Sequence, residues 1–230
     1  MKTIGLIGGM SWESTLPYYR IVNETVRARL GGLHSAKLVL YSVDFDAIER
    51  LQRDGRWDEA GASLADAARA LAAAGAEFLV LCTNTMHRVA AAIEAASGLP
   101  LLHVAEPTAA AIHADGHRRV GLLGTRFTME EPFYRERLEA RHGLEVVVPA
   151  AAERAIVHRV IYEELCRGEV LETSRAELRR ILAALVDRGA RGVILGCTEL
   201  SLLVGAGDAD VPLYDTTALH ARAAAERALA

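Results

Sequence analysis

The chain contains an internal repeat, and this repeat limits the folds it can adopt. Residues 75–84 (GAEFLVLCTN) align without a gap on residues 189–198 (GARGVILGCT), at a shift of 114 positions. Two shorter matches keep the same order: residues 4–8 (IGLIG) on 120–124 (VGLLG), and 99–101 (LPL) on 211–213 (VPL). Three anchors at nearly one spacing predict two related halves that present two similar reactive groups to one small molecule.

Short apolar runs alternate with helical segments along the chain. Several runs lack polar alternation, which is typical of parallel strands covered on both faces. Strand–helix alternation predicts an α/β fold with parallel sheets. The expected strands are 2–7, 37–42, 78–82, 100–104, 120–123, 144–148, 193–195 and 212–214, and the clearest helices are 58–74, 173–187 and 217–229.

Cys197 is the strongest candidate for a reactive group. It follows a buried-looking strand, stands beside Gly196 and precedes Thr198 and Glu199. Ligands gather beyond the carboxyl ends of parallel strands. A helix N-terminus or neighbouring donors can lower the pKa of a thiol from about 8.5. We therefore expect a reactive thiol here, against the alternative of a buried, inert cysteine.

The register of the repeat selects the partner of Cys197. Thr83 falls opposite Cys197, whereas Cys82 falls opposite Gly196. Because strand side chains alternate between faces, a one-residue shift normally turns a side chain the other way. Cys82 is therefore expected to pack in the core and Thr83 to face the ligand. His87 follows closely; it is a candidate base, but we favour a structural role.

The glycine-rich turn at residues 5–10 (GLIGGM) resembles a nucleotide-binding turn only superficially. Its spacing does not match G-x-G-x-x-G, and no Walker lysine follows. A tight strand-to-helix turn is expected. A second interpretation is that its backbone N–H groups face a small carboxylate.

Charge and composition exclude several classes of protein. The formal charge of -4 argues against a nucleic-acid partner. No apolar run approaches the roughly 18 residues that suggest a membrane span, and the first residues lack the pattern of a signal peptide. Three scattered cysteines do not form a disulfide framework. A cytoplasmic protein with free thiols is expected.

Cofactor chemistry has little support in the sequence. The two lysines, Lys2 and Lys37, both stand at the start of an expected strand, where they are poorly placed to form a Schiff base with PLP. No cofactor is therefore expected. The histidines show no metal-binding spacing, and a metal held by Cys82, Cys197 and a histidine is a minor alternative.

Together these motifs resemble the aspartate/glutamate racemase family. Residues 81–87 (LCTNTMH) resemble its first signature and residues 195–199 (LGCTE) its second, and residues 8–11 (GGMS) also fit. The resemblance covers the whole chain. It implies a cofactor-independent amino-acid racemase with two pseudo-symmetric Rossmann-like domains, 1–98 plus 208–230 and 99–207, and an active-site cleft between them. A homodimer acting on a small amino acid is expected.

The resemblance also implies a two-group mechanism, in which one group removes the α-proton and the other delivers a proton to the opposite face. Most relatives carry a cysteine where this chain has Thr83. A hydroxyl is a far weaker acid than a thiol, so unequal forward and reverse rates are expected. Cys197 is expected to be the better proton-abstracting group, facing the L-amino acid, and Thr83 to be or to position the proton donor.

Aspartate and glutamate are the favoured substrates. The amide and hydroxyl groups of Asn84, Thr85 and Thr198 suit an α-carboxylate and developing carbanion charge, and Glu199 either holds the ammonium group or supports the turn. The substrate-binding residues expected are Met10, Gln52, Asn84, Thr85, Thr125, Thr198 and Glu199.

Four residues are candidates to bind the side-chain carboxylate of the substrate. Residues 44–54 offer Arg50, Gln52 and Arg53, and Arg126 is a further candidate. The segment 163–168 (EELCRG) lacks the lysine often found in relatives.

Two other functions fit the same residues. A sister activity, such as a hydantoin racemase, maleate isomerase or malonate decarboxylase, also places cysteines at equivalent turns. A protein that binds a small dicarboxylate without turning it over is the second alternative, and the presence of Thr83 in place of a cysteine favours it.

Overall fold

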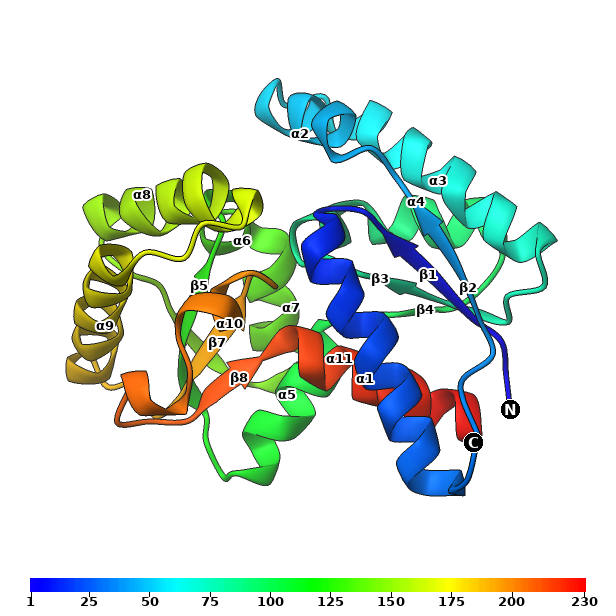
Figure 1. The fold of residues 1–230 in the computed structure, drawn as a ribbon. Helices are drawn as coiled ribbons and strands as arrows, with labels where there is room; N and C mark the ends of the chain where they lie inside the picture. The colour runs from blue at the N-terminus through cyan, green and yellow to red at the C-terminus, as the bar shows by residue number, and fades with distance from the viewer. The chain divides into compact units, whose positions relative to one another are not determined.

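The protein consists of two compact α/β units. The computed structural model describes residues 1–230, and its units are Met1–Val104 with His220–Ala230, and Ala105–Leu219. Each unit contains one four-stranded parallel sheet (Figure 1). The predicted α/β fold with two similar parallel-sheet halves is confirmed.

All eight expected strands are present, and each differs from its predicted range only at the ends. The strand order is β2-β1-β3-β4 in the first unit and β6-β5-β7-β8 in the second, so the two orders are equivalent. The strands are β1 (Ile4–Gly8), β2 (Leu38–Ser42), β3 (Phe78–Leu81), β4 (Leu101–Leu102), β5 (Arg119–Gly124), β6 (Glu145–Val147), β7 (Val193–Gly196) and β8 (Leu213–Asp215).

The internal repeat is preserved in the strand register. In the first sheet Leu79 of β3 pairs with Gly5 of β1, and in the second Val193 of β7 pairs with Gly121 of β5. The sequence alignment equates the same residues, and the register of β4 and β8 agrees with it. Residues that follow β3 and β7 at the same distance therefore occupy equivalent places in their sheets.

Helices cover both faces of the first sheet. One face packs against α1 (Trp12–Leu30) and the part of α11 (Thr216–Leu229) that belongs to this unit, and the two helices lie side by side in Figure 1. The other face packs against α3 (Trp57–Ala73) and α4 (Ala90–Ser97). Alanine has the highest helix propensity, and its small side chain lets the alanine-rich α3 approach α4 closely.

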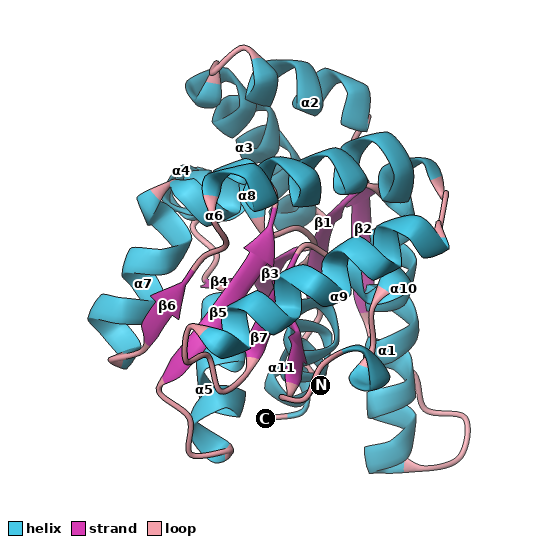
Figure 2. Ribbon diagram, turned by 90° about the vertical axis from the view of Figure 1, so that its left-hand side faces the viewer, coloured by secondary structure: helices cyan, strands magenta, loops and turns pink.

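The second sheet is covered in a similar way. Side chains of α8 (Ala151–Arg159) and α9 (Glu172–Asp187) form a core with β5 and β7, and both helices lie over these strands in Figure 2. The helices α5 (Ala105–Ala114) and α7 (Pro132–His142) contact each other and the outer strands β8 and β6. Buried on both faces, the strands need no polar alternation.

The remaining elements are short. They are α2 (Phe45–Arg53), η1 (Thr85–Val89), α6 (Arg126–Glu130), η2 (Val160–Glu164), η3 (Leu165–Arg167), α10 (Leu200–Leu203) and η4 (Ala206–Asp208). Of these, η1 directly follows the β3 turn and α10 the β7 turn, so the two halves share this feature too.

The boundaries of the units lie later in the chain than the predicted boundaries at 98/99 and 207/208. The chain passes from the first unit to the second after Val104 and returns before His220. The difference has a clear cause: β4 pairs with β3 and so stays in the first unit, whereas β8 pairs with β7 and so stays in the second.

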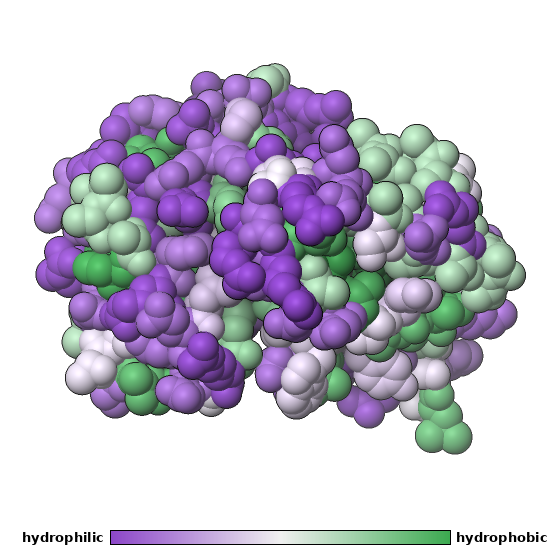
Figure 3. All heavy atoms as spheres, turned by 90° about the horizontal axis from the view of Figure 1, so that it is seen from above, coloured by the Kyte–Doolittle hydropathy of each residue, from purple (hydrophilic) through white to green (hydrophobic).

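The surface carries no extended apolar band in the view of Figure 3. Hydrophilic residues dominate the left and centre of that face, and hydrophobic residues gather toward its right side. None of the helices combines the length and apolar composition needed to cross a membrane.

Candidate active site

The β3 turn carries Thr83, the residue that the repeat equates with Cys197. The side chain is largely buried, at 8% exposure. The Thr83 backbone N–H donates to the Leu81 carbonyl at 2.8 Å, and the Thr83 carbonyl is hydrogen-bonded to His87 Nδ1 at 2.8 Å. The backbone of this turn is therefore fixed on both sides of Thr83.

Asn84 and Thr85 follow at the start of η1, and both are buried. The Asn84 carbonyl accepts from the backbone N–H of His87 at 3.1 Å. Amide and hydroxyl groups are thus concentrated beyond the carboxyl end of β3, where ligands gather in parallel sheets.

Cys82 lies in the core. Its side chain is fully buried among apolar side chains from β1, α1 and α11, and its nearest polar contact is a weak one to the Val80 carbonyl at 3.9 Å. Burial raises the pKa of the Cys82 thiol far above its usual range, because a thiolate there would be desolvated. This thiol is an inert packing group.

The β7 turn joins a thiol to a carboxylate. Cys197 Sγ donates to Glu199 Oε2 at 3.0 Å, and Thr198 Oγ1 donates to the same oxygen at 2.6 Å. The other carboxylate oxygen, Oε1, receives a long contact from Cys166 Sγ at 3.8 Å. Thus three side chains converge on one buried carboxylate within the second unit.

The environment of Cys197 raises its pKa well above the ordinary value. Burial is the largest cause, followed by the negative charge of Glu199 and the neighbouring Cys166. The prediction that this turn lowers the thiol pKa is therefore wrong. Glu199, two residues on, turns its carboxylate toward the sulfur, so the nearest charge has the wrong sign. The thiol keeps its proton at neutral pH.

Gln52 is the buried polar residue of α2. It is 3% exposed, and its Nε2 donates to Met86 Sδ at 3.0 Å. The arginines on either side, Arg50 and Arg53, are instead exposed and pair with acidic residues of the same helix. Of the three candidates for the distal carboxylate in this segment, only Gln52 points into the protein.

In the glycine-rich turn after β1, a backbone N–H group is hydrogen-bonded within the protein. The backbone N–H of Gly9 donates to Thr15 Oγ1 at 2.9 Å, so this N–H is not directed at a ligand. Gly9 has a φ of 91°, and a Cβ there would lie 2.3 Å from the Val43 carbonyl oxygen. The turn is tight, as expected, and Met10 beyond it is buried in the α3 core.

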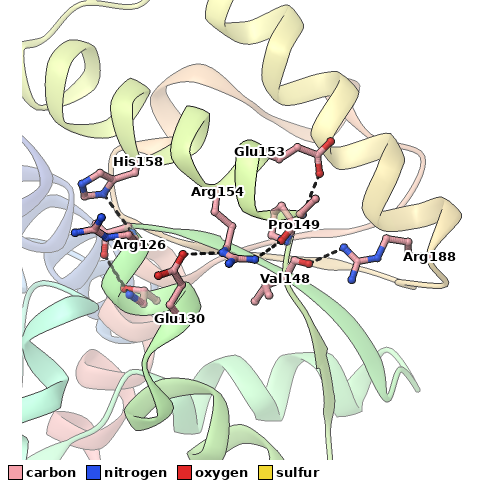
Figure 4. Close-up of polar contacts among 11 residues, drawn as sticks. Arg126, Glu130, Val148, Pro149, Glu153, Arg154, His158 and Arg188 are labelled. Carbon is pink, nitrogen blue, oxygen red and sulfur yellow. Dashed lines mark hydrogen bonds and ion pairs between the residues drawn. The ribbon is translucent and has the colours of Figure 1, made fainter.

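Thr125 occupies the equivalent turn after β5. It caps α6, accepting a hydrogen bond from the Thr128 N–H at 3.3 Å, and it is buried. The next residue, Arg126, is exposed, and its backbone N–H donates to His158 Nδ1 at 3.2 Å (Figure 4). Arg154, also drawn there, bridges Glu130 and a backbone carbonyl.

The structure also places the possible metal ligands and the two lysines. No group of three or more His, Cys, Asp or Glu side chains is arranged to hold a metal ion. Lys2 and Lys37 are both exposed at the start of a strand. The chemistry available is that of a thiol, a carboxylate, hydroxyls and amides.

Sequence reasoning missed three neighbours of the site. Cys166 was counted only as one of three scattered cysteines, yet it contacts the carboxylate that binds Cys197. His103 and His220 pack around His87, with ring centroids 4.4 and 5.8 Å away. These residues are far apart in sequence, and no spacing signals their contact.

The fold and the two turns define an α/β protein with an internal repeat and a hydrogen-bonded thiol and carboxylate at the end of one sheet. The chain belongs to the Asp/Glu/Hydantoin racemase family, whose model matches residues 7–224. This confirms the family that the sequence motifs indicated.

Individual relatives agree over the whole chain. The crystal structure of a candidate Asp/Glu racemase from Yersinia pestis is 59% identical, with 100% of both chains covered and a TM-score of 0.93. That of an aspartate racemase homologue from Pyrococcus horikoshii OT3 is 37% identical, again with 100% of both chains covered, at a TM-score of 0.85. The broad specificity amino-acid racemase RacX of Bacillus subtilis (strain 168) is 25% identical, covering 99% of this chain and 98% of that protein.

Proposed function

We propose that this protein is a cofactor-independent amino-acid racemase that acts on aspartate, glutamate or both. The observation that carries the proposal is the hydrogen bond from Cys197 to Glu199. Cys197 occupies the position in its sheet that Thr83 occupies in the other. A thiol with an adjacent carboxylate can exchange a proton with a carbon acid, and a second protic group can serve the opposite face.

In the proposed reaction Glu199 first accepts the Cys197 proton, leaving a thiolate and a carboxylic acid. The thiolate then removes the α-proton of the substrate. Burial and the Glu199 charge raise the pKa of Cys197, so the thiolate is scarce but strongly basic. A strong base is what the weakly acidic Cα–H bond requires.

Reprotonation occurs on the opposite face of Cα. The Thr83 hydroxyl gives its proton to the carbanion. Water then returns a proton to the Thr83 oxygen while Glu199 releases its proton to solvent, so all three groups return to their starting forms and solvent hydrogen enters the product. Because Thr83 is a poor base, the direction in which Thr83 must remove the α-proton of the substrate is the slower one. The two enantiomers therefore differ in kcat, while kcat/KM is the same in both directions because the equilibrium constant of a racemisation is unity.

Substrate choice rests on Gln52 rather than on an arginine. The buried Gln52 amide can donate to a distal carboxylate, whereas Arg50 and Arg53 are paired at the surface. A neutral amide discriminates less strongly than a guanidinium, and the RacX relative has broad specificity by name. Neutral amino acids therefore belong in the assay alongside the acidic ones.

The test is solvent exchange without added PLP. Each enantiomer of aspartate, glutamate and a neutral set is incubated separately in D₂O, and deuterium at Cα is followed by NMR. Exchange of an acidic substrate supports the proposal. Tight binding without exchange would instead indicate a dicarboxylate-binding protein, and turnover of hydantoins or maleate alone would indicate a sister activity.

A further inference from the structure

His87 uses both ring nitrogens for backbone hydrogen bonds. Its Nδ1 lies 2.8 Å from the Thr83 carbonyl oxygen, and its Nε2 lies 3.1 Å from the backbone nitrogen of Val104. The ring is buried, at 3% exposure. The His87 side chain thus connects the β3 turn to Val104, the last residue of the segment Met1–Val104.

These partners fix the protonation state of the ring. A carbonyl oxygen can only accept, so Nδ1 carries the hydrogen. A backbone N–H can only donate, so Nε2 has a lone pair. His87 is therefore a neutral imidazole in the Nδ1–H form, and neither nitrogen is left to act as a base on a substrate.

The equivalent turn of the second unit is held without an imidazole. The repeat pairs His87 with Ser201, whose Oγ donates to the Thr198 carbonyl at 3.1 Å. The Cys197 carbonyl, which corresponds to that of Thr83, accepts from the backbone N–H of Leu200 at 3.2 Å. The side-chain support of the reactive residue's own carbonyl is thus confined to the Thr83 turn.

His87 also contacts both points at which the chain changes units. Val104 is the last residue before the first crossing, and His220 is the first residue after the second. The rings of His87 and His220 have centroids 5.8 Å apart. His220 is itself held by Tyr18 at 2.9 Å and by the Leu102 carbonyl at 2.7 Å.

We infer that His87 is a positioning residue for Thr83, which it holds in place through the Nδ1–H bond to the Thr83 carbonyl while Nε2 anchors the ring on Val104. This inference rests on the proposed racemase function, in which Thr83 delivers the proton. The bond restrains the backbone from which the Thr83 hydroxyl projects. Misplacement of a reacting group by about 1 Å costs roughly 100-fold in rate.

Two substitutions separate the two ends of the ring. In His87→Asn the amide nitrogen lies near the former Nδ1 and can still donate to the Thr83 carbonyl. In His87→Gln the longer side chain reaches the former Nε2 position and loses that donation. We expect His87→Gln to lower the exchange rate kcat by about 10- to 100-fold with little change in KM, and His87→Asn to recover most of the loss.

Tyr18→Phe is the matched control. It removes the hydroxyl that binds His220 in the same core, so it lowers stability without touching the Thr83 turn. Its kcat should remain at the wild-type level. Wild-type exchange by His87→Gln, equal losses in both His87 variants, or a matching loss in Tyr18→Phe would each overturn the inference.

Nitrogen NMR of the wild-type protein gives a readout that needs neither activity nor a folded variant. We expect a protonated Nδ1, an unprotonated Nε2 and a slowly exchanging Nδ1–H. An Nε2–H form or an imidazolium at neutral pH would overturn the inference. If the wild-type protein shows this tautomer but exchanges no amino acid, the racemase function fails and the His87–Thr83 bond stands.

Discussion

The turns that end β3 and β7 occupy equivalent places in their sheets but hold the side chains of Thr83 and Cys197 in different ways. At the β3 turn the hydroxyl of Thr83 projects from a backbone restrained by a neutral imidazole. At the β7 turn the thiol of Cys197 binds a carboxylate directly. The neighbouring side chain positions the backbone at the β3 turn, whereas at the β7 turn it places a negative charge beside the thiol. The two turns therefore share a backbone position but differ in the chemistry of their side chains.

The largest effect is expected from removing the thiol of the β7 turn. Cys197→Ala should lower exchange at Cα by about 1000-fold or more from either enantiomer, since general acid–base groups contribute about 10²- to 10⁴-fold. Deuterium incorporation with L- and D-aspartate measures it. Cys82→Ala is the matched control, because that thiol is buried in the core. If Cys82→Ala rather than Cys197→Ala stops exchange, the register of the repeat is misassigned.

Glu199→Gln tests whether charge is the working principle of the β7 turn. Without the carboxylate, Cys197 loses its proton acceptor, and kcat should fall by about 100-fold. The pKa of Cys197 should fall as well, because the negative charge that raises it is gone. The pH profile of Cys197 alkylation by iodoacetamide should then move to lower pH. An unchanged profile would show that burial alone sets this pKa.

Acid should weaken the first unit through its buried histidines. Burial lowers the pKa of His220 to about 4 in the folded protein, against about 6.5 when unfolded. The stability this provides is fully present above pH 6.5 and is lost as the pH falls toward 4. At about pH 5 the loss is about 2 kcal/mol. Urea unfolding at about pH 7.5 and about pH 5 measures it, and His220→Gln should flatten that dependence; an equally steep dependence in the variant would assign it to other groups.

The smallest expected effect makes the two turns alike. Thr83→Cys places a thiol at both positions and should speed the slower direction by about tenfold, because a thiolate is a better base than a hydroxyl. Initial rates at saturating concentrations of each enantiomer measure kcat in the two directions. The faster direction serves as the internal control, and a gain in both directions alike would argue against the assigned roles.

The strands and their register could be predicted because buried parallel strands leave a clear sequence signal. Each appears as a short apolar run, and the repeat aligned β3 with β7 to the residue. The packing of Cys82 followed from the same register. These predictions depend on local patterns and on comparison within the chain, both of which are visible without a structure.

Other properties depend on contacts that no local pattern records. The pKa of Cys197 was predicted in the wrong direction because the orientation of the Glu199 side chain decides it. Gln52 was expected to bind substrate, but the face of α2 that turns inward, which distinguishes Gln52 from Arg50 and Arg53, is known only from the structure. The cluster of His87, His103 and His220 joins segments more than 100 residues apart. The unit boundaries differ because the pairing of β4 with β3 and of β8 with β7, which assigns these strands to their units, is not visible in the sequence.

Gly196 has a consequence for how far the halves are exchangeable. A Cβ at this position would lie 2.8 Å from Leu122 Cδ1 and 2.9 Å from the Leu123 carbonyl oxygen, whereas its counterpart Cys82 carries a full side chain. Grafting the first signature onto the second sheet would therefore collide at its second residue, before any catalytic group is in place. The two halves share a fold, but these segments cannot be exchanged between them. The steric conflict lies at Gly196, directly before Cys197.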